Sequence, residues 1–392
     1  MLPLEGVTVV ALEQAVAAPL ATRNLADLGA RVIKIERVGV GDLARGYDHV
    51  VDGAASHFVW LNRGKESLAV DLQNPAGADV VRRLIANSDA VVQNLAPGAA
   101  ARLGLDAERL RAEHPELIVV TMSGFGAGGP YSDRKAYDML IQAEAGLISL
   151  TGTAEHQVKT GIPTSDIAAG MYASQALLGA LIRRYRTGVG AAIDVSMLDA
   201  TVEWMGHAVY TQLYTGAQPP RMGVSHAAIA PYDSYPTSDG QMLIGVQSDP
   251  GWRDLVIEAL DAPELADDER FTTNVLRVRH RAACDAEVAL RTRAFTTAQL
   301  GERLLAAGVP AAQIKQVADV IDHPQLKDRW RTTTTEFGTI PTLLPPAAFA
   351  DFEAPMGVVP ALGQHSRALL AEAGLTAEQA DALIADEVVG LP

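Results

Sequence analysis

The chain has 392 residues, of which 48 % are apolar and 20 % charged, a composition typical of a globular protein with two domains or with one large and one small domain. Its net charge of −15 and the lack of any long uncharged apolar run argue against nucleic acid and membranes as main partners. The single cysteine, Cys284, excludes a disulfide within the chain and a cysteine-based metal cluster, and it favours a reducing, cytoplasmic location.

Short apolar runs alternate with helical patterns through the first part of the chain. We expect strands at 7–12, 31–35, 67–72, 90–93 and 117–122, and helices at 18–28, 75–86 and 107–113. This alternation predicts an α/β fold built on a doubly wound parallel sheet.

Residues 161–182 combine a turn, three cap-type residues at 164–166 and a helix rich in small residues. The spacing predicts a buried face made of Ile167, Met171, Leu178, Leu181 and Ile182. Asp166 is expected at the helix N-terminus, where backbone N–H groups and the helix dipole keep a carboxylate ionised. It is either an ordinary N-cap or a nucleophile toward an activated acyl group, and the same N–H groups would then stabilise an oxyanion.

The second half of the chain begins with a proline-rich, irregular stretch at 219–236. A strand at 240–246 and helices at 252–260 and 298–307, the latter capped by Thr297, indicate a separate structural unit. Thr376 and Gln379 have the spacing of a capping box that opens a last helix.

Motifs for cofactors are missing from this pattern. No G-x-G-x-x-G follows the first strand, although Glu36 ends the second, so a nicotinamide enzyme is disfavoured. The histidines lack metal-binding spacing and no G-x-S-x-G elbow occurs, so we expect no metal.

Six segments in order carry a resemblance to a known family: LADLGARVIKIER (25–37), NRGKESLAVDL (62–72), QNLAPGAAARLGL (93–105), GGPYSDRKAYDMLIQAEAG (128–146), TSDIAAGMYASQALLGAL (164–181) and GQHSRALLAEAGL (363–375). Together they resemble the family III coenzyme A-transferases, a group that includes formyl-CoA transferase, carnitine CoA-transferase and the α-methylacyl-CoA racemases. The resemblance covers nearly the whole chain.

The resemblance implies a Rossmann-like large domain made from residues 1–215 and from the returning segment 329–392, with a smaller α+β domain inserted at 216–328. It also implies an interlocked homodimer, an acyl-CoA and a carboxylic acid as substrates, and no cofactor beyond coenzyme A itself.

The resemblance places Asp166 on the family's nucleophilic aspartate. It implies contacts with CoA for Val16, Arg37, Asp71, Leu72, Asn94, Leu95, Arg102, Lys135, Ala136, Tyr137 and Asp138. Val16 stands where formyl-CoA transferase has an active-site glutamine, which argues against formyl and oxalyl groups as substrates.

Two alternatives share this resemblance, namely an α-methylacyl-CoA racemase and a non-catalytic acyl-CoA-binding protein. Racemases place a histidine directly before the acid of the KAYD-like segment, where this chain has Tyr137, whose ordinary pKa of about 10 is poorly matched to proton exchange at neutral pH. The presence of Asp166 argues against a protein that only binds acyl-CoA.

The segments GDLARGYD, SHFVWLNR and SHAAIAPY resemble those of the family branch that acts on small dicarboxylates, such as the succinyl-CoA:itaconate CoA-transferases. A dicarboxylate needs a partner for its non-reacting carboxylate, because a buried unpaired charge is costly. The candidates are Arg45, Arg221 and His226, and His226 either fills this role or only caps a turn.

Overall fold

The computed structural model describes all 392 residues, which divide into two compact units. The first unit comprises Met1–Ile148, Lys159–Tyr210 and Asp328–Pro392, and the second comprises Ser149–Val158 and Thr211–Lys327. The helices α7 (Leu147–Leu150) and α10 (Gly206–Thr215) run from the first unit into the second. The second unit thus contains a short segment, Ser149–Val158, that precedes the residues 216–328 implied by the resemblance.

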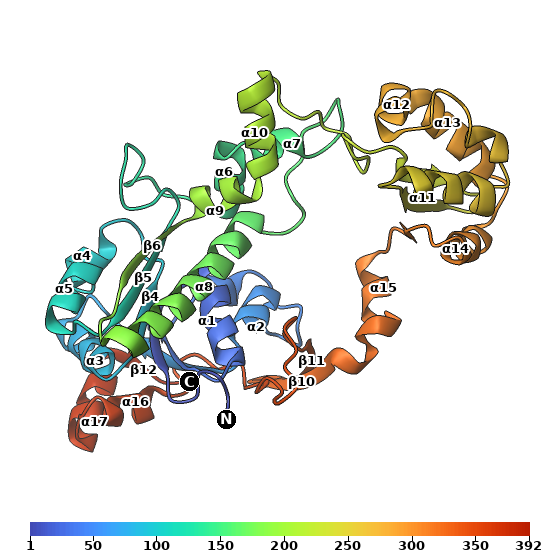
Figure 1. Ribbon diagram of the computed structural model, residues 1–392. Helices are drawn as coiled ribbons and strands as arrows, with labels where there is room; N and C mark the ends of the chain where they lie inside the picture. The colour runs from blue at the N-terminus through green and yellow to red at the C-terminus, as the bar shows by residue number, and fades with distance from the viewer. The chain divides into compact units, whose positions relative to one another are not determined.

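A seven-stranded sheet forms the centre of the first unit, in the order β12-β3-β2-β1-β4-β5-β6 (Figure 1). Its strands are β1 (Thr8–Leu12), β2 (Arg31–Glu36), β3 (Lys65–Val70), β4 (Ala90–Gln93), β5 (Ile118–Ser123), β6 (Ala192–Ser196) and β12 (Val389–Gly390). All neighbouring pairs are parallel except β12 with β3, which is antiparallel. The doubly wound α/β prediction is confirmed, with a short antiparallel strand added at one edge.

Helices cover both faces of this sheet because successive residues of each strand point to opposite sides. On β1, Val9 and Ala11 pack toward α1 (Ala17–Asp27) and α8 (Thr164–Thr187), whereas Val10 and Leu12 pack toward the other face. The helices of that other face are α3 (Pro75–Ala86), α5 (Ala107–Glu113), α16 (Ser366–Glu372) and α17 (Ala377–Ala385). The capping box predicted for the last helix is present, with Thr376 as the N-cap of α17.

The remaining elements of the first unit are smaller. They are the 3₁₀ turns Leu43–Gly46 and Pro324–Arg329 (the latter reaching it from the second unit), the helices α2 (Ser56–Asn62), α4 (Ala99–Leu103), α6 (Asp138–Glu144) and α9 (Met197–Trp204), and the antiparallel pair β10 (Trp330–Thr335) and β11 (Gly338–Leu343).

The buried face of α8 differs from the predicted one. Met171 and Ile182 are exposed, and the buried positions are mostly small residues: Ser165, Ala168, Ala169, Gly170, Ala173, Leu177, Ala180 and Leu181. The reason is the close approach of α1, since a Cβ atom on Gly170 would lie 2.6 Å from the carbonyl oxygen of Ala17. The prediction is confirmed for Leu181, which is buried, and for Ile167 and Leu178, which pack against buried clusters, and it is wrong for Met171 and Ile182.

The second unit is an α+β structure around an antiparallel sheet of β7 (Tyr232–Pro236), β8 (Gln241–Gly245) and β9 (Ala311–Ala312). Its helices are α11 (Asp249–Asp254), which continues into a π-helical turn at Leu255–Ala259, α12 (Asn274–Arg279), α13 (Arg281–Thr292), α14 (Thr297–Ala306) and α15 (Val317–Ile321), with a 3₁₀ turn at Pro263–Leu265. The N-cap of α14 is Thr296 rather than the predicted Thr297, because Thr296 and Gln299 form the capping box.

Candidate active site

Asp166 is the third residue of α8, whose N-cap is Pro163. The cap of this helix comes from elsewhere in the chain: Asp138, the first residue of α6, accepts the backbone N–H groups of Ser165 (2.8 Å) and Asp166 (3.1 Å) through Oδ1. The side chain of Gln142 holds the other oxygen of Asp138 at 2.6 Å. Asp166 is therefore not the cap, and its carboxylate lies beside a second carboxylate.

This arrangement changes the electrostatics expected from the sequence. Burial, and then the negative charge of Asp138, raise the pKa of Asp166 to about 7. The helix N-terminus was expected to keep Asp166 ionised and to offer N–H groups to an oxyanion, but two of those N–H groups already donate to Asp138. The result is a poorly solvated carboxylate that ionises near neutral pH, which suits a nucleophile or a base.

Residues around Asp166 come from three other segments. Val16, directly before α1, packs with Leu20 and Leu61 in a small cluster that also contacts Ile167. Ala136 packs against Gly124, where an added Cβ would lie 2.2 Å from the Ala136 Cβ, so the glycine allows the 135–138 segment to lie at the end of β5.

Tyr47 is a residue near Asp166 that the sequence analysis missed. Burial, followed by the charges of Asp42, Asp166 and Tyr137, raises its pKa, so its hydroxyl stays protonated at neutral pH. It follows the 3₁₀ turn Leu43–Gly46, and no periodic or motif signal marks such a turn as part of a site.

A large cleft of about 1090 Å³ lies at the carboxyl ends of the central parallel strands. Five predicted CoA contacts line it: Arg37, Asp71, Leu72, Leu95 and Arg102. Arg82, Gln73 and Glu387 also line the cleft, and none of these was predicted. Glu13 and Gln14 also line the cleft, three and two residues before Val16, which packs in the cluster that contacts Ile167 of α8.

The charged groups of the cleft divide into free and engaged ones. Arg37 and Arg102 are exposed and their guanidinium groups make no ion pair or hydrogen bond within the chain, whereas Arg82 donates to the carbonyl of Leu103 at 3.0 Å. Free guanidinium groups at the edge of a cleft suit phosphate recognition. Two free guanidinium groups in one cleft give it local positive charge in a protein whose net charge is −15.

Two of the predicted CoA contacts, Lys135 and Asn94, do not line the cleft. Lys135 is exposed in the loop before α6 and does not line the cleft. The side chain of Asn94 is engaged with the backbone of Gln14, accepting its N–H at 3.0 Å and donating to its carbonyl at 2.9 Å.

Two of the three residues proposed for a second carboxylate are already engaged. Arg45 makes a bidentate ion pair with Glu36 (2.8 and 2.9 Å) and lies over the ring of Phe58. Arg221 donates to the carbonyls of Thr153 (2.8 Å) and Ala154 (2.9 Å). Both guanidinium groups have structural partners within the chain, and their contact with the substrate stays a prediction.

His226 is exposed and differently placed. Its Nδ1 accepts the N–H of Ala228 at 3.1 Å, which puts the proton of the neutral ring on Nε2. The ring stacks on Tyr232, with centroids 5.5 Å apart and planes 14° from parallel. The Nε2–H group is thus a candidate donor held in one orientation.

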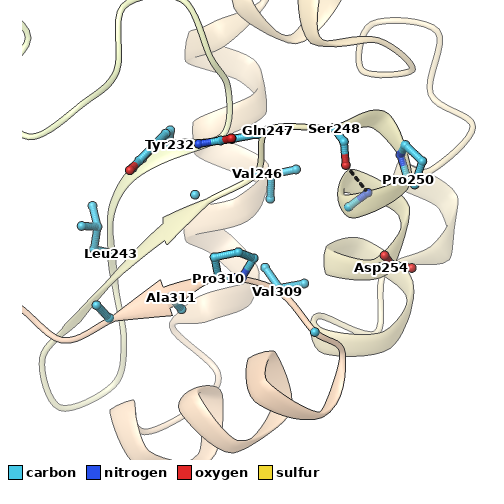
Figure 2. Close-up of a pocket in the computed structure, with 14 residues that line it drawn as sticks. Tyr232, Leu243, Val246, Gln247, Ser248, Pro250, Asp254, Val309, Pro310 and Ala311 are labelled. Carbon is cyan, nitrogen blue, oxygen red and sulfur yellow. Dashed lines mark hydrogen bonds between the residues drawn. The ribbon is translucent and has the colours of Figure 1, made fainter. Parts of the chain in front are cut away.

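Tyr232 also lines a cavity of about 600 Å³ within the second unit, between β8 and the start of α11 (Figure 2). Ser248 in its wall accepts the N–H of Gly251 at 3.2 Å and so caps α11. Asp254 is the one charged residue that lines it, so the cavity offers no cation to an anionic ligand.

No group of three or more His, Cys, Asp or Glu residues has an arrangement that suits a metal ion, and none of the helices is long and apolar enough to cross a membrane.

Comparison with known proteins places these features in a family. Residues 4–366 match CoA-transferase family III. The chain is 34 % identical to a succinate–glutarate CoA-transferase of Agrobacterium fabrum, over 94 % of this chain and 95 % of the relative. It is 32 % identical to a succinyl-CoA–D-citramalate CoA-transferase of Chloroflexus aurantiacus, over 99 % and 98 % of the two chains.

Among solved structures, a CAIB/BAIF family protein from Brucella suis superposes with a TM-score of 0.84 at 37 % identity, covering 95 % of this chain and 99 % of the other. The family match, the relatives and the shared fold agree over nearly the full length. The chain belongs to CoA-transferase family III.

Proposed function

We propose that this enzyme transfers coenzyme A from succinyl-CoA to a C4–C5 dicarboxylate of the itaconate type, with Asp166 as the nucleophile. The observations that support the proposal are the half-buried Asp166 carboxylate, which ionises near neutral pH, and a cleft in the same unit that is lined by two free arginines. The names of the Agrobacterium and Chloroflexus relatives, which pair succinyl groups with C5 diacids, support the same substrate class.

The proposed reaction begins when a carboxylate oxygen of Asp166 attacks the carbonyl carbon of succinyl-CoA. The carbon–sulfur bond breaks, and the products are an aspartyl–succinyl anhydride and the CoA thiolate. The thiolate, retained by its nucleotide in the cleft, attacks the Asp166 carbonyl carbon and expels succinate, which leaves an aspartyl-CoA thioester.

The second half repeats these steps with the acceptor. Its carboxylate attacks the aspartyl-CoA thioester and expels the thiolate, forming a new anhydride. The thiolate then attacks the acceptor's acyl carbon, which releases the new CoA ester and returns Asp166 as a carboxylate. No redox or metal chemistry takes part in this sequence.

The racemase alternative has less support. Racemisation needs a second acid or base across the α-carbon from the first. The residue before Asp138 is Tyr137 rather than a histidine, and the pKa of the neighbouring Tyr47 is raised above the ordinary tyrosine value, which already lies well above neutral pH.

We also propose that the enzyme is a homodimer, which light scattering on the purified protein will test.

The decisive experiment incubates the enzyme with succinyl-CoA or acetyl-CoA and a panel of acids, and identifies new CoA esters by mass spectrometry. Itaconate, mesaconate, citramalate, malate and glutarate are expected to be acceptors, and monocarboxylates poor ones. Efficient transfer to carnitine, formate or oxalate without turnover of any C4–C5 diacid would overturn the substrate assignment while leaving the family assignment unchanged.

Recognition of the second carboxylate is assigned to His226 in this proposal. His226→Ala is expected to raise the KM for the diacid about tenfold, with a smaller change in the KM for the CoA ester, because a charge-assisted hydrogen bond is lost. His156→Ala, at another exposed histidine of the second unit, serves as the control. Equal KM values for the diacid in the two variants would leave His226 as a turn residue only.

The pH dependence of the reaction is expected to follow the Asp166–Asp138 pair. Only ionised Asp166 is nucleophilic, so kcat/KM should fall about tenfold for each pH unit below about 7. Asp138→Asn removes the negative charge that raises the pKa of Asp166, while the amide oxygen still accepts the α8 N–H groups. The acidic limb of the pH profile should therefore move to lower pH. A limb that stays in place would show that burial alone sets this pKa.

A further inference from the structure

Four charged side chains form a cluster in the first unit that is fully closed to solvent: Glu13, Lys34, Asp42 and Lys65. Lys65 lies 2.6 Å from Glu13, and Lys34 lies 3.3 Å from Glu13 and 2.7 Å from Asp42. Burial opposes the charge of Glu13, yet the two lysines hold its pKa below the usual value. A buried cluster of this kind is a costly way to stabilise a fold, so its position needs another reason.

Asp42 is the member of the cluster whose carboxylate accepts hydrogen bonds from two loops, the one after β1 and the 3₁₀ turn Leu43–Gly46. Its Oδ1 accepts the N–H of Ala15 and the N–H of Ala44, each at 2.9 Å, while its Oδ2 accepts Lys34 Nζ at 2.7 Å. Ala15 belongs to the loop that follows β1, and Ala44 belongs to the 3₁₀ turn Leu43–Gly46. One carboxylate therefore ties together two loops that are separated in the sequence.

The first of these loops is strained. Ala15 has a φ of +65°, a left-handed conformation that is unfavourable for a residue with a Cβ. The next residue, Val16, packs in the cluster that touches Ile167, and Ala17 lies against Gly170 of α8. The position of the Ala15 backbone thus determines where α1 begins beside the Asp166 helix.

The second loop carries Tyr47, which follows the 3₁₀ turn that Asp42 caps. Both loops therefore contact the Asp42 carboxylate, and they lead to Tyr47, whose pKa responds to Asp166, and to Val16, which packs in the cluster that contacts Ile167.

We propose that Asp42 is a positioning residue, which uses the buried Lys34–Glu13–Lys65 charges to hold the Ala15 loop and the Tyr47 loop against Asp166. Asp42 also lines the cleft, but both of its oxygens are engaged by the chain, so it acts on catalysis through the two loops. The proposal rests on the function proposed above in taking Asp166 as the reacting group.

The test compares Asp42→Asn with Asp27→Asn. Asp27 is an equally buried acid, paired with Arg63 at 2.6 Å at the far end of α1, and it serves as a matched control for the loss of a buried ion pair. In Asp42→Asn, kcat is expected to fall at least about tenfold, while the Kd for CoA, measured by calorimetry, changes less than about twofold. In Asp27→Asn, kcat is expected to stay within about twofold at a similar loss of stability.

A second readout does not depend on activity. Amide hydrogen exchange in peptides covering Ala15 and Ala44 should be faster in Asp42→Asn and unchanged in Asp27→Asn. This arm still tests the inference if the wild-type enzyme turns over none of the proposed substrates, an outcome that would refute the proposed function alone. An unchanged kcat in folded Asp42→Asn, or unchanged exchange at both loops, would overturn the positioning role.

If Asp42→Asn does not fold, Asp42→Glu replaces it. Glutamate keeps the charge for Lys34 but adds a methylene to a fully packed site, so it cannot hold both loop N–H groups at their present distances. The same split is expected, with a lower kcat and an unchanged Kd for CoA. Wild-type kcat in this variant would contradict the inference.

Discussion

Asp166→Asn is expected to lower turnover by a factor of about 10³ or more, because asparagine is not a nucleophile and cannot form the anhydride. The fold should remain, since the backbone N–H of residue 166 still donates to Asp138. Hydroxylamine added during turnover of the wild-type enzyme should modify Asp166, and peptide mass spectrometry will locate the product.

Asp199→Asn is the matched control for this variant. Asp199 is the third residue of α9, after the N-cap Ser196, as Asp166 is the third residue of α8, but it is exposed. Its replacement should leave turnover within about twofold of wild type. Substantial activity of Asp166→Asn that is not explained by deamidation would refute the nucleophile assignment.

The Asp166→Asn variant should be more stable than the wild type at high pH. The pKa of Asp166 is about 7 in the folded protein, against about 3.9 for an aspartate in an unfolded chain. Between these values the native state binds the proton more tightly than the unfolded state, so wild-type stability falls as pH rises from about 4 to about 7. Asparagine does not titrate, so the free energy of unfolding of Asp166→Asn does not change in this way. The stability advantage of the variant over the wild type is absent near pH 4 and reaches up to about 4 kcal/mol above pH 7. Urea unfolding at both pH values will measure it.

Loss of Arg37 or Arg102 is expected to have the next largest effect. Each single alanine variant should weaken binding of the CoA ester about tenfold to a hundredfold, because a charge-assisted phosphate contact contributes about 1.5–3 kcal/mol. The kcat at saturating CoA ester should change little, since both side chains lie at the cleft and away from the reacting carboxylate. Binding to the wild type should also weaken with added salt.

Controls for the arginines come from the same region. Arg109→Ala on α5 removes an exposed arginine that lies 3.9 Å from Glu113 and does not line the cleft, so it should not affect binding. Lys135→Ala should have a smaller effect than either cleft arginine, because Lys135 lies outside the cleft. Unchanged affinity in both Arg37→Ala and Arg102→Ala would show that these are ordinary surface charges.

The sequence by itself determined the fold class and the family. The strands β1 to β5 and the helices α1, α3 and α5 appear as local patterns that are visible in a single chain, whereas the edge strands β6 and β12 were not predicted. The ordered motifs were sufficient to identify family III, and they led to a cleft that five of the predicted CoA contacts line. The roles of those residues stay predictions until the variants above are measured.

Only the tertiary structure decided what surrounds each candidate. Asp138 caps α8 from 27 residues away in the chain, and burial, followed by the charge of Asp138, raises the pKa of Asp166 to about 7. Arg45 is engaged by Glu36, and the exposed face of α8 carries Met171, which spacing had placed in the core. The buried Lys34–Asp42 pair left no local signal, because lysine and aspartate are ordinarily exposed. These outcomes depend on contacts between distant segments, and the energy of such contacts is set by packing and burial that no local pattern contains.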